Sequence, residues 1–240
     1  GKLEEFRNLN LKNHLNVVDP EKDKLKLGVF EIDFFRVTHS IPDGVGLIIR
    51  TPIGTVVHTG DFKFDHSPVD DKNTDIAKIA EAGEKGVLAL MSDSTNAESP
   101  GYSPSEKTLE DTFNNIFTNA EGRVIIASFA SQINRIQQII NVANKKGRRL
   151  AFSGRSMLKN VEIAVRLGYL KVPQGLIVRV EEANKVPDSG IAIMCTGSQG
   201  ESMSALARMS SGEHKQIKIK RGDTVIFSAS PIPGNESSVT

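Results

Sequence analysis

Residues 124–152, VIIASFASQINRIQQIINVANKKGRRLAF, contain the pattern strand, helix, strand. The apolar run at 124–127 predicts a short buried strand, and residues 150–152 predict the next one. Between them, apolar residues recur with a period near 3.6, which predicts a helix over residues 131–145. A strand, a helix and a second strand in succession are typical of parallel strands in an α/β protein.

The same alternation continues outward from this stretch. Further helices are predicted at 105–117, 156–167 and 203–209, and further strands at 191–194 and 224–227. Upstream, β-rich runs lie at 29–37, 45–50 and 55–58, with a turn at 51–54 that predicts a hairpin; a capped helix at 73–84 and a buried strand at 86–92 follow. We therefore expect an α/β fold whose second part is a mainly parallel, doubly wound sheet.

Composition excludes several classes of protein. The 240 residues carry 30 basic and 29 acidic side chains, a net charge of +1, so neither a polyanion-coating tail nor a disordered chain is indicated. The apolar runs are far shorter than a bilayer helix needs, and the single cysteine, Cys195, has no partner for an internal disulfide. With no secretory pattern at residues 1–5, these features predict a cytoplasmic protein.

Two residues that follow β-rich runs are candidate metal ligands. His39 lies in Thr38–Asp43, and Asp61 lies in the stretch TGDFKFD at 59–65. Imidazole and carboxylate together suit zinc or manganese. A catalytic zinc needs about three protein ligands, so spacing alone leaves a structural role for His39 open.

A series of motifs resembles ribonuclease J, a nuclease family of the β-CASP group with a metallo-β-lactamase fold. The motifs occur in family order along nearly the whole chain: HSIPD at 39–43, TGDFKFD at 59–65, SDSTNAE at 92–98, ASFAS at 127–131, GRSM at 154–157, TGSQGE at 196–201 and PIPGNE at 231–236. This resemblance implies part of a metallo-β-lactamase αββα domain at 1–103, a β-CASP domain at 104–234, and the start of a return to the first domain at 235–240.

The resemblance also implies roles for three residues. His39 matches a metal ligand of the family, Asp61 matches the carboxylate that bridges two metal ions, and Asp93 matches a catalytic-site carboxylate that orients a histidine. In the full-length protein, the resemblance implies two divalent metal ions, which we expect to be zinc, with manganese or magnesium as alternatives. The family's His-x-His-x-Asp-His motif and its closing histidine motif are absent from this sequence, so we expect the chain by itself to be inactive and to hold no metal stably. Half of a lactamase sandwich is also expected to leave a sheet face or edge uncovered.

Hydroxyl, glycine and arginine residues follow three predicted parallel strands. They are Ser128, Ser131, Arg155, Ser156, Gly197, Ser198 and Gln199. Because the carboxyl ends of parallel strands face one crevice, we expect these residues to lie along one edge, with the 196–200 loop leading into a helix N-terminus. By resemblance, this edge is where the 5′-monophosphate of an RNA would bind. Residues 144–171 add a local charge of +7, either as phosphate contacts or as solvated surface.

Three functions remain open at this point. The resemblance implies a metal-dependent ribonuclease, both a 5′-to-3′ exonuclease and an endonuclease, which acts on single-stranded RNA in RNA maturation and decay and forms a homo-oligomer. The alternative is a non-catalytic RNA or nucleotide-phosphate binding module on a β-CASP fold. A β-CASP DNA nuclease is disfavoured, because the blocks at 196–201 and 231–236 resemble the RNA branch.

Overall fold

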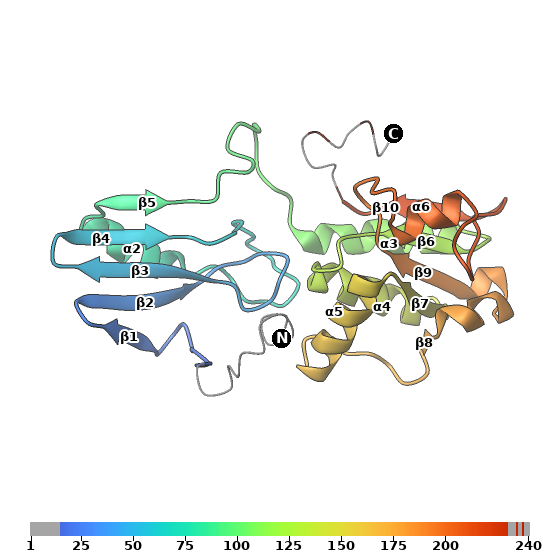
Figure 1. Ribbon diagram of the computed structural model, residues 1–240, viewed down its shortest axis with the longest axis horizontal. Helices are drawn as coiled ribbons and strands as arrows, with labels where there is room; N and C mark the ends of the chain where they lie inside the picture. The colour runs from blue at the N-terminus through green and yellow to red at the C-terminus, as the bar shows by residue number, and fades with distance from the viewer. Residues whose placement is uncertain (1–14, 230–233, 235–236, 238–240) are drawn as a thin grey trace. The chain divides into compact units, whose positions relative to one another are not determined.

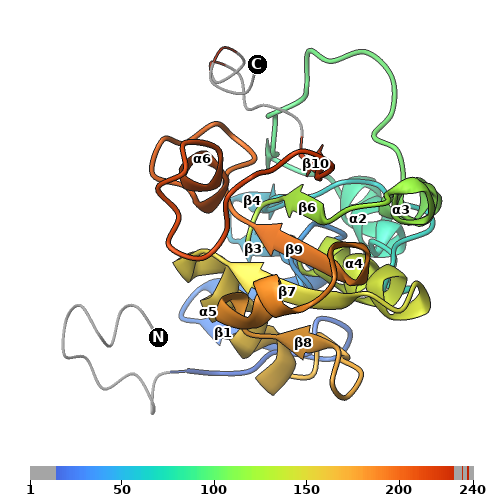
Figure 2. The same ribbon diagram turned by 90° about the vertical axis from the view of Figure 1, so that its right-hand side faces the viewer.

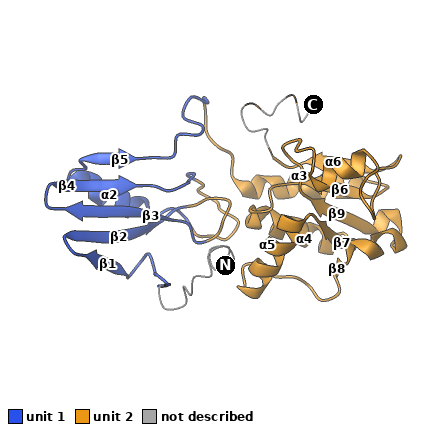
Figure 3. Cartoon of the chain, in the orientation of Figure 1, with its two compact units in different colours: residues 1–37, 43–64, 73–100 blue, residues 38–42, 65–72, 101–240 orange. Residues whose placement is uncertain are grey.

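The computed structural model describes residues 15–229, 234 and 237 of the chain (Figure 1). These residues form two compact units, which Figure 3 shows in different colours. Within the described residues, unit 1 comprises 15–37, 43–64 and 73–100, and unit 2 comprises 38–42, 65–72, 101–229, 234 and 237. The motif at 231–236 lies almost wholly outside the described residues. The domain limits at 103/104 and 234/235 stay predictions.

Unit 1 is built on a five-stranded sheet with the order β1-β2-β3-β4-β5. Strands β1 to β4 are antiparallel, whereas β4 and β5 run parallel. The elements are β1 (Lys24–Leu27), β2 (Phe30–Arg36), β3 (Val45–Thr51), β4 (Gly54–His58), α2 (Ile76–Glu84) and β5 (Ala89–Met91). The predicted hairpin is confirmed, because Thr51 pairs with Gly54 across the turn between β3 and β4.

Helix α2 packs on one face of this sheet. The Asp75 side chain accepts a hydrogen bond from the Lys78 amide (3.1 Å) and so caps the helix, as the sequence predicted. Ala82 of α2 is buried in a cluster with apolar side chains of β2, β3 and β4. The ring of Phe35 lies so close to Gly46 that a Cβ there would be 2.1 Å from it. Glycine at this position therefore leaves the space that the far end of the Phe35 ring occupies.

The rest of the unit 1 sheet is less well covered. Leu25 in β1 and Met91 in β5, which the register places on the face opposite α2, are 41% and 56% exposed. All three residues of β5 are exposed, so the prediction of a buried strand over 86–92 is wrong in burial and in length. An incompletely covered apolar face agrees with the expectation of a partial sandwich.

Unit 2 contains a second five-stranded sheet with the order β10-β6-β9-β7-β8, in which every neighbouring pair is parallel. Its strands are β6 (Val124–Ala127), β7 (Arg149–Ser153), β8 (Ile177–Val178), β9 (Ile191–Cys195) and β10 (Thr224–Phe227). Its helices are η1 (Glu106–Thr108), α3 (Leu109–Asn119), α4 (Ile133–Lys145), α5 (Arg155–Arg166), η2 (Val180–Lys185), η3 (Asp188–Gly190) and α6 (Ala205–Ser210). The predicted α/β fold with a parallel, doubly wound sheet is confirmed.

Two clusters of buried apolar side chains cover the two faces of this parallel sheet, whose strands and helices Figure 2 shows from another side. On one face, side chains of α3, α4 and α5 pack against alternate residues of the strands, including the buried Val124, Phe152 and Met194. On the other face, α6, η2 and Ile217 pack against the remaining residues, including Ile125 and Ile193. All four residues of β6 and all five of β9 are buried, because these strands are covered on both sides.

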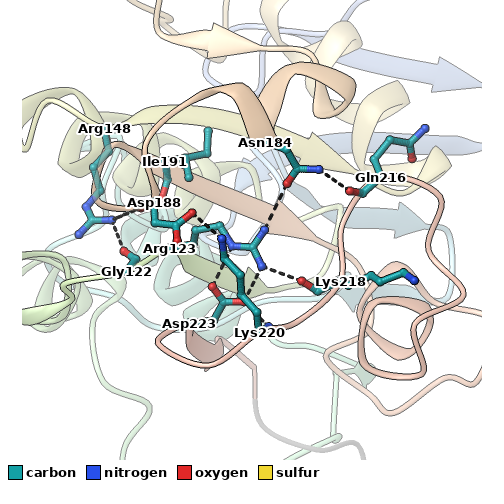
Figure 4. Close-up of polar contacts among 10 residues, drawn as sticks. All are labelled: Gly122, Arg123, Arg148, Asn184, Asp188, Ile191, Gln216, Lys218, Lys220 and Asp223. Carbon is teal, nitrogen blue, oxygen red and sulfur yellow. Dashed lines mark hydrogen bonds and ion pairs between the residues drawn. The ribbon is translucent and has the colours of Figure 1, made fainter.

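The amino ends of the strands are held together by two buried arginines (Figure 4). Arg123 donates to both carboxylate oxygens of Asp223, at 2.8 and 2.6 Å, and to the carbonyl of Lys218 at 2.7 Å. Arg148 donates to the carbonyls of Gly122 (2.7 Å) and Ala120. Burial lowers the pKa of Arg148, whereas the Asp223 carboxylate raises that of Arg123. Arg148 is therefore structural, so it does not belong among the phosphate-contacting residues of 144–171.

Candidate phosphate-binding edge and candidate metal residues

The candidate phosphate-binding residues follow three adjacent strands of unit 2. Strand β9 lies between β6 and β7, so the loops at 128–132, 154–156 and 196–200 begin side by side. We call this the carboxyl edge. The amide of Ser128 donates to the carbonyl of Cys195 (3.0 Å), which joins the first and third loops directly. The topological expectation that these loops share one edge is confirmed.

Glycine is required where these loops approach each other. Gly154 has φ of 105°, and a Cβ at this position would lie 2.7 Å from the hydroxyl oxygen of Thr196. Gly197 has φ of 119°, and a Cβ there would lie 2.5 Å from the hydroxyl oxygen of Ser204. Both positions combine a backbone conformation that side chains rarely adopt with a close contact. The glycines therefore allow two loops to pack at the centre of the edge.

Helix α6, which follows the 196–200 loop, does not offer unbonded amides to a phosphate as the sequence predicted. The amides at the start of α6 are already bonded: Ala207 to the Ser204 hydroxyl (3.2 Å), and Leu206 to the carbonyl of Thr196 (3.0 Å). The prediction that the 196–200 loop presents a helix N-terminus to a phosphate is therefore wrong for α6. Helix α5 begins after Gly154 with no side-chain cap, so its first amides remain available at the carboxyl edge.

The candidate residues differ in accessibility. Ser128 and Ser198 are each 1% exposed, and the Ser128 hydroxyl donates to the side chain of Gln132 (3.1 Å). Gln199 and Gly197 are also buried, whereas Ser131 is partly exposed. Arg155 and Ser156, the first two residues of α5, are both exposed. The accessible cation and hydroxyl at this edge therefore come from the start of α5.

A buried histidine ties the end of β7 to the segment after α6. His214 Nε2 lies 2.9 Å from the Ser153 hydroxyl. Its Nδ1 accepts hydrogen bonds from the amides of Gln216 (3.3 Å) and Ile217 (3.1 Å). Because Nδ1 accepts, the ring is neutral and carries its proton on Nε2. His214 thus holds together two of the segments that flank the 154–156 and 196–200 loops.

We expect this histidine to make stability depend on pH. Burial first, and the charge of Arg208 second, lower the pKa of His214 below its ordinary value of 6.5. The unfolded chain then binds the proton more readily, so the stabilisation is complete above pH 6.5 and falls as the pH drops towards the lowered value. Urea unfolding of the wild type and of His214→Gln between pH 5 and 8 measures this. An equal acid slope in both proteins would contradict the assignment.

The two acidic candidates of unit 1 lie at the ends of β4 and β5. The Thr59 amide donates to the carbonyl of Met91 (3.0 Å), and the Thr59 hydroxyl accepts from the amide of Asp93 (3.1 Å). Asp93 in turn accepts from the amide and hydroxyl of Thr95, at 2.9 and 2.7 Å. Asp61 is exposed, two residues beyond Thr59. Because β4 and β5 are parallel, both carboxylates follow strands that end at the same edge.

The third candidate, His39, is partly exposed and groups with unit 2. The proposed pair of His39 and Asp61 therefore involves both units and stays a prediction. Within residues 15–229, no group of three or more histidine, cysteine, aspartate or glutamate side chains is placed to hold a metal ion. Two donors of the right chemistry do not make a complete catalytic site, so the described residues fit only part of a metal centre.

Sequence reasoning missed one polar link at the carboxyl edge. The Arg135 guanidinium binds the Glu106 carboxylate, with its shortest contact at 2.7 Å, and donates to the carbonyl of Ser228 at 2.5 Å. The Glu106 amide donates to the Asp65 carboxylate (3.2 Å). Arg135 thus joins α4, η1 and the end of β10. In the sequence it stands only as a polar residue inside an amphipathic helix, and its partners are 29 and 93 residues away.

Comparison with known proteins identifies the family. Residues 121–240 match the family model for the β-CASP domain of ribonuclease J. The chain belongs to the ribonuclease J family. Ribonuclease J of Thermus thermophilus is 51% identical over all 240 residues and that of Synechocystis is 49% identical over 239. Ribonuclease J2 of Bacillus subtilis is 47% identical over 206 residues, or 86% of this chain.

The chain spans only part of these relatives: 42% of the Thermus protein, and 37% each of the Synechocystis and Bacillus proteins. A solved structure of a protein of unknown function from Enterococcus faecalis aligns with 75% of this chain and 44% of its own, with a TM-score of 0.53 and 15% identity. That likeness supports the fold alone. The β-CASP family match, not this likeness, gives the fold class of a metallo-β-lactamase and β-CASP protein, as the ribonuclease J resemblance implied.

Proposed function

We propose that the protein that contains this chain is a metal-dependent ribonuclease, both a 5′-to-3′ exonuclease and an endonuclease, that acts on single-stranded RNA in cytoplasmic RNA maturation and decay. The carboxyl edge of unit 2 is the observation that carries this proposal. There, three adjacent loops and the open N-terminus of α5 present amides, hydroxyls and Arg155 in one place. Amides at a helix start together with a guanidinium suit a terminal phosphate.

In this proposal, the chain supplies part of the catalytic centre. His39 and Asp61 are metal donors, and Asp93, whose loop is fixed by Thr59 and Thr95, orients a histidine from outside the described residues. Two divalent ions, zinc first and manganese or magnesium as alternatives, would supply Lewis-acid chemistry at the phosphodiester. The carboxyl edge would hold the 5′-monophosphate of the RNA, and the longer protein would assemble as a homo-oligomer.

Metal content and RNA cleavage test this proposal together. We would compare this chain with a version extended by the flanking segments of its relatives, using RNAs with a 5′-monophosphate or a 5′-hydroxyl. We expect only the extended protein to hold about two metal ions and to cut, with a preference for the 5′-monophosphate. Cleavage by the chain alone would show that the metal site is built from other residues.

Arg155 gives a sharper test of the phosphate site. We expect Arg155→Ala to reduce the preference for 5′-monophosphorylated over 5′-hydroxyl RNA by about tenfold, the worth of one charged hydrogen bond. Arg166→Ala is the matched control, because Arg166 is an exposed arginine at the other end of the same helix. Equal effects of the two substitutions on this preference would place the 5′ phosphate elsewhere.

The second candidate function is a non-catalytic RNA-binding module. It is favoured by the finding that, in the part of the chain the structure describes, no three metal-binding side chains gather. This reading predicts that the extended protein binds 5′-monophosphorylated RNA with the same dependence on Arg155 but holds no stoichiometric metal. The metal analysis described above therefore separates the two functions.

A further inference from the structure

Unit 2 includes two short segments, 38–42 and 65–72, that lie far from the rest of the unit in the sequence. Each adjoins a proposed metal donor along the chain. His39 lies within the first segment, and Asp61 stands four residues before Asp65, which begins the second. No helix or strand in the described part of the chain includes either segment. Their positions therefore depend on contacts with the rest of unit 2 and not on a regular ladder of hydrogen bonds.

The 65–72 segment is fixed to the start of η1 by buried polar contacts. The Asp65 carboxylate accepts from the amides of Ser67 (3.0 Å) and Glu106 (3.2 Å), and Asp65 is only 5% exposed. The Ser105 hydroxyl donates to the Ser67 carbonyl at 2.8 Å. A buried carboxylate resists displacement from its donors, because its charge would then be left without hydrogen bonds. The start of η1 therefore determines where this segment lies.

The 65–72 segment also contacts the segment of His39. The Thr38 hydroxyl donates to the carbonyl of Lys72 at 3.5 Å, and Thr38 is only 6% exposed. Thr38 directly precedes His39 in the chain. The backbone that carries the imidazole is therefore held, in part, by the segment that Asp65 fixes to η1.

Arg135 fixes η1 to the carboxyl edge. Its Nη2 binds both carboxylate oxygens of Glu106, at 2.9 and 2.7 Å, and its Nη1 donates to the Ser228 carbonyl at 2.5 Å. The Ser228 amide donates to the carbonyl of Ala127, the last residue of β6, at 2.8 Å. Gln138, three residues after Arg135, donates to the Glu106 carbonyl at 2.7 Å. A planar guanidinium with five donors can hold both partners at a fixed angle, which a lysine cannot do.

These contacts form one continuous path within unit 2. It leads from the end of β6 through Arg135, Glu106 and the 65–72 segment to Thr38. One end of the path lies at the proposed phosphate site, and the other adjoins a proposed metal ligand. A displacement of about 1 Å between two such groups can cost roughly a hundredfold in rate, so their separation has to be held closely.

We propose that Arg135 is a positioning residue that, through Glu106 and the 65–72 segment, fixes the backbone of His39 relative to the carboxyl edge. This inference rests on the proposed function and adds to it the side chain that sets the distance between a metal ligand and the bound 5′ phosphate. Arg135 itself touches neither the metal nor the RNA.

Hydrogen exchange on this chain tests the path without metal or RNA. Arg135→Gln breaks the path at the carboxyl edge, and Asp65→Asn weakens it at the far end while keeping the shape of the side chain. We expect each variant to raise amide exchange in 38–42 and 65–72 by about tenfold, because contacts that close these segments are lost. Exchange in 154–156, which the path does not include, should stay as in the wild type.

Arg123→Gln is the matched control. Arg123 is also a buried arginine that binds a carboxylate, but it lies at the amino end of the same sheet. We expect Arg123→Gln to lower the free energy of unfolding and to leave exchange in 38–42 and 65–72 unchanged. The control thus separates a local loss of contacts from a general loss of stability.

Metal affinity and turnover of the extended protein test the consequence for function. We expect Arg135→Gln to weaken metal binding and to lower kcat by about tenfold each, the usual cost of removing a group that supports a metal ligand. Binding of 5′-monophosphorylated RNA, measured with a chelator present, should change little, because α5 and not Arg135 holds the 5′ phosphate. Arg123→Gln should change none of these three quantities.

The outcomes separate this inference from the proposed function. Unchanged exchange in both segments, or an equal rise in Arg123→Gln, overturns the positioning role and leaves the proposed function standing. Raised exchange with unchanged metal affinity and kcat also overturns it, and so does a loss of RNA binding as large as the loss of kcat. An extended wild-type protein that holds no metal and cuts no RNA overturns the proposed function, and this inference with it.

Discussion

Replacement of Asp223 by alanine should lower the free energy of unfolding by about 3–5 kcal/mol, because it leaves a buried arginine without its partner. The side chains of Arg123 and Asp223 are only 4% and 1% exposed, and two hydrogen bonds join them. Asp223 raises the pKa of Arg123 in the wild type, and an arginine stays charged at every ordinary pH even without that partner, so its charge is left uncompensated in the variant. Urea unfolding of the whole chain at neutral pH measures this loss.

Two further variants define the cause. Lys220→Ala removes the ion pair between Lys220 and Asp188. Both of these side chains are half exposed, so the substitution should change the free energy of unfolding little. Arg123→Met combined with Asp223→Leu removes both buried charges, and we expect it to recover much of the loss from Asp223→Ala. If Asp223→Ala were no more harmful than Lys220→Ala, the amino end of the sheet would not depend on this pair.

The alternation of strands and helices in unit 2 was predictable because its signals are local. Buried runs such as 124–127 and amphipathic stretches such as 131–145 lie in short windows, and parallel pairing follows from their order. Strand β8 was missed because it has only two residues. Strand β5 was predicted as buried from the apolar run at 86–92, yet Leu88 and Leu90 are each 64% exposed, since burial depends on what covers a strand.

Buried arginines show the limit of reading charge from the sequence. Arg148 counted towards the basic excess at 144–171, but it is 4% exposed and donates to backbone carbonyls. Arg123 pairs with Asp223, which is 100 residues away in the chain. A sequence window contains neither the carbonyls nor the distant carboxylate, so it cannot separate a structural guanidinium from one that faces a nucleic acid.

The position of the candidate site could be predicted from the sequence, because it follows from the order of the strands. Parallel strands end at one edge, so the shared position of the loops at 128, 154 and 196 followed from topology. Which groups at that edge remain available depends on contacts that only the structure gives. Ser204 and Thr196 occupy the first amides of α6, while Gly154 leaves those of α5 without a side-chain cap.

Gly197→Ala should lower the free energy of unfolding by about 2–4 kcal/mol, because backbone strain adds to overpacking. Gly197 has φ of 119°, and the new Cβ would meet Ser204 Oγ at 2.5 Å and Leu206 Cβ at 2.8 Å. Relief of that contact requires the 196–200 loop to move away from the start of α6. We therefore expect weaker binding of 5′-monophosphorylated RNA in addition to the loss of stability, measured by urea unfolding and by anisotropy.

Gly147→Ala separates strain from steric contact. Gly147 also has a positive φ, of 65°, but a Cβ there meets nothing within 4 Å. Its replacement should cost about 1 kcal/mol through backbone strain alone and should leave RNA binding unchanged. If both alanine variants lost the same stability and bound RNA equally well, close packing between the 196–200 loop and α6 would not shape the carboxyl edge. If Gly197→Ala alone weakened binding, the position of that loop would be part of how the RNA end is held.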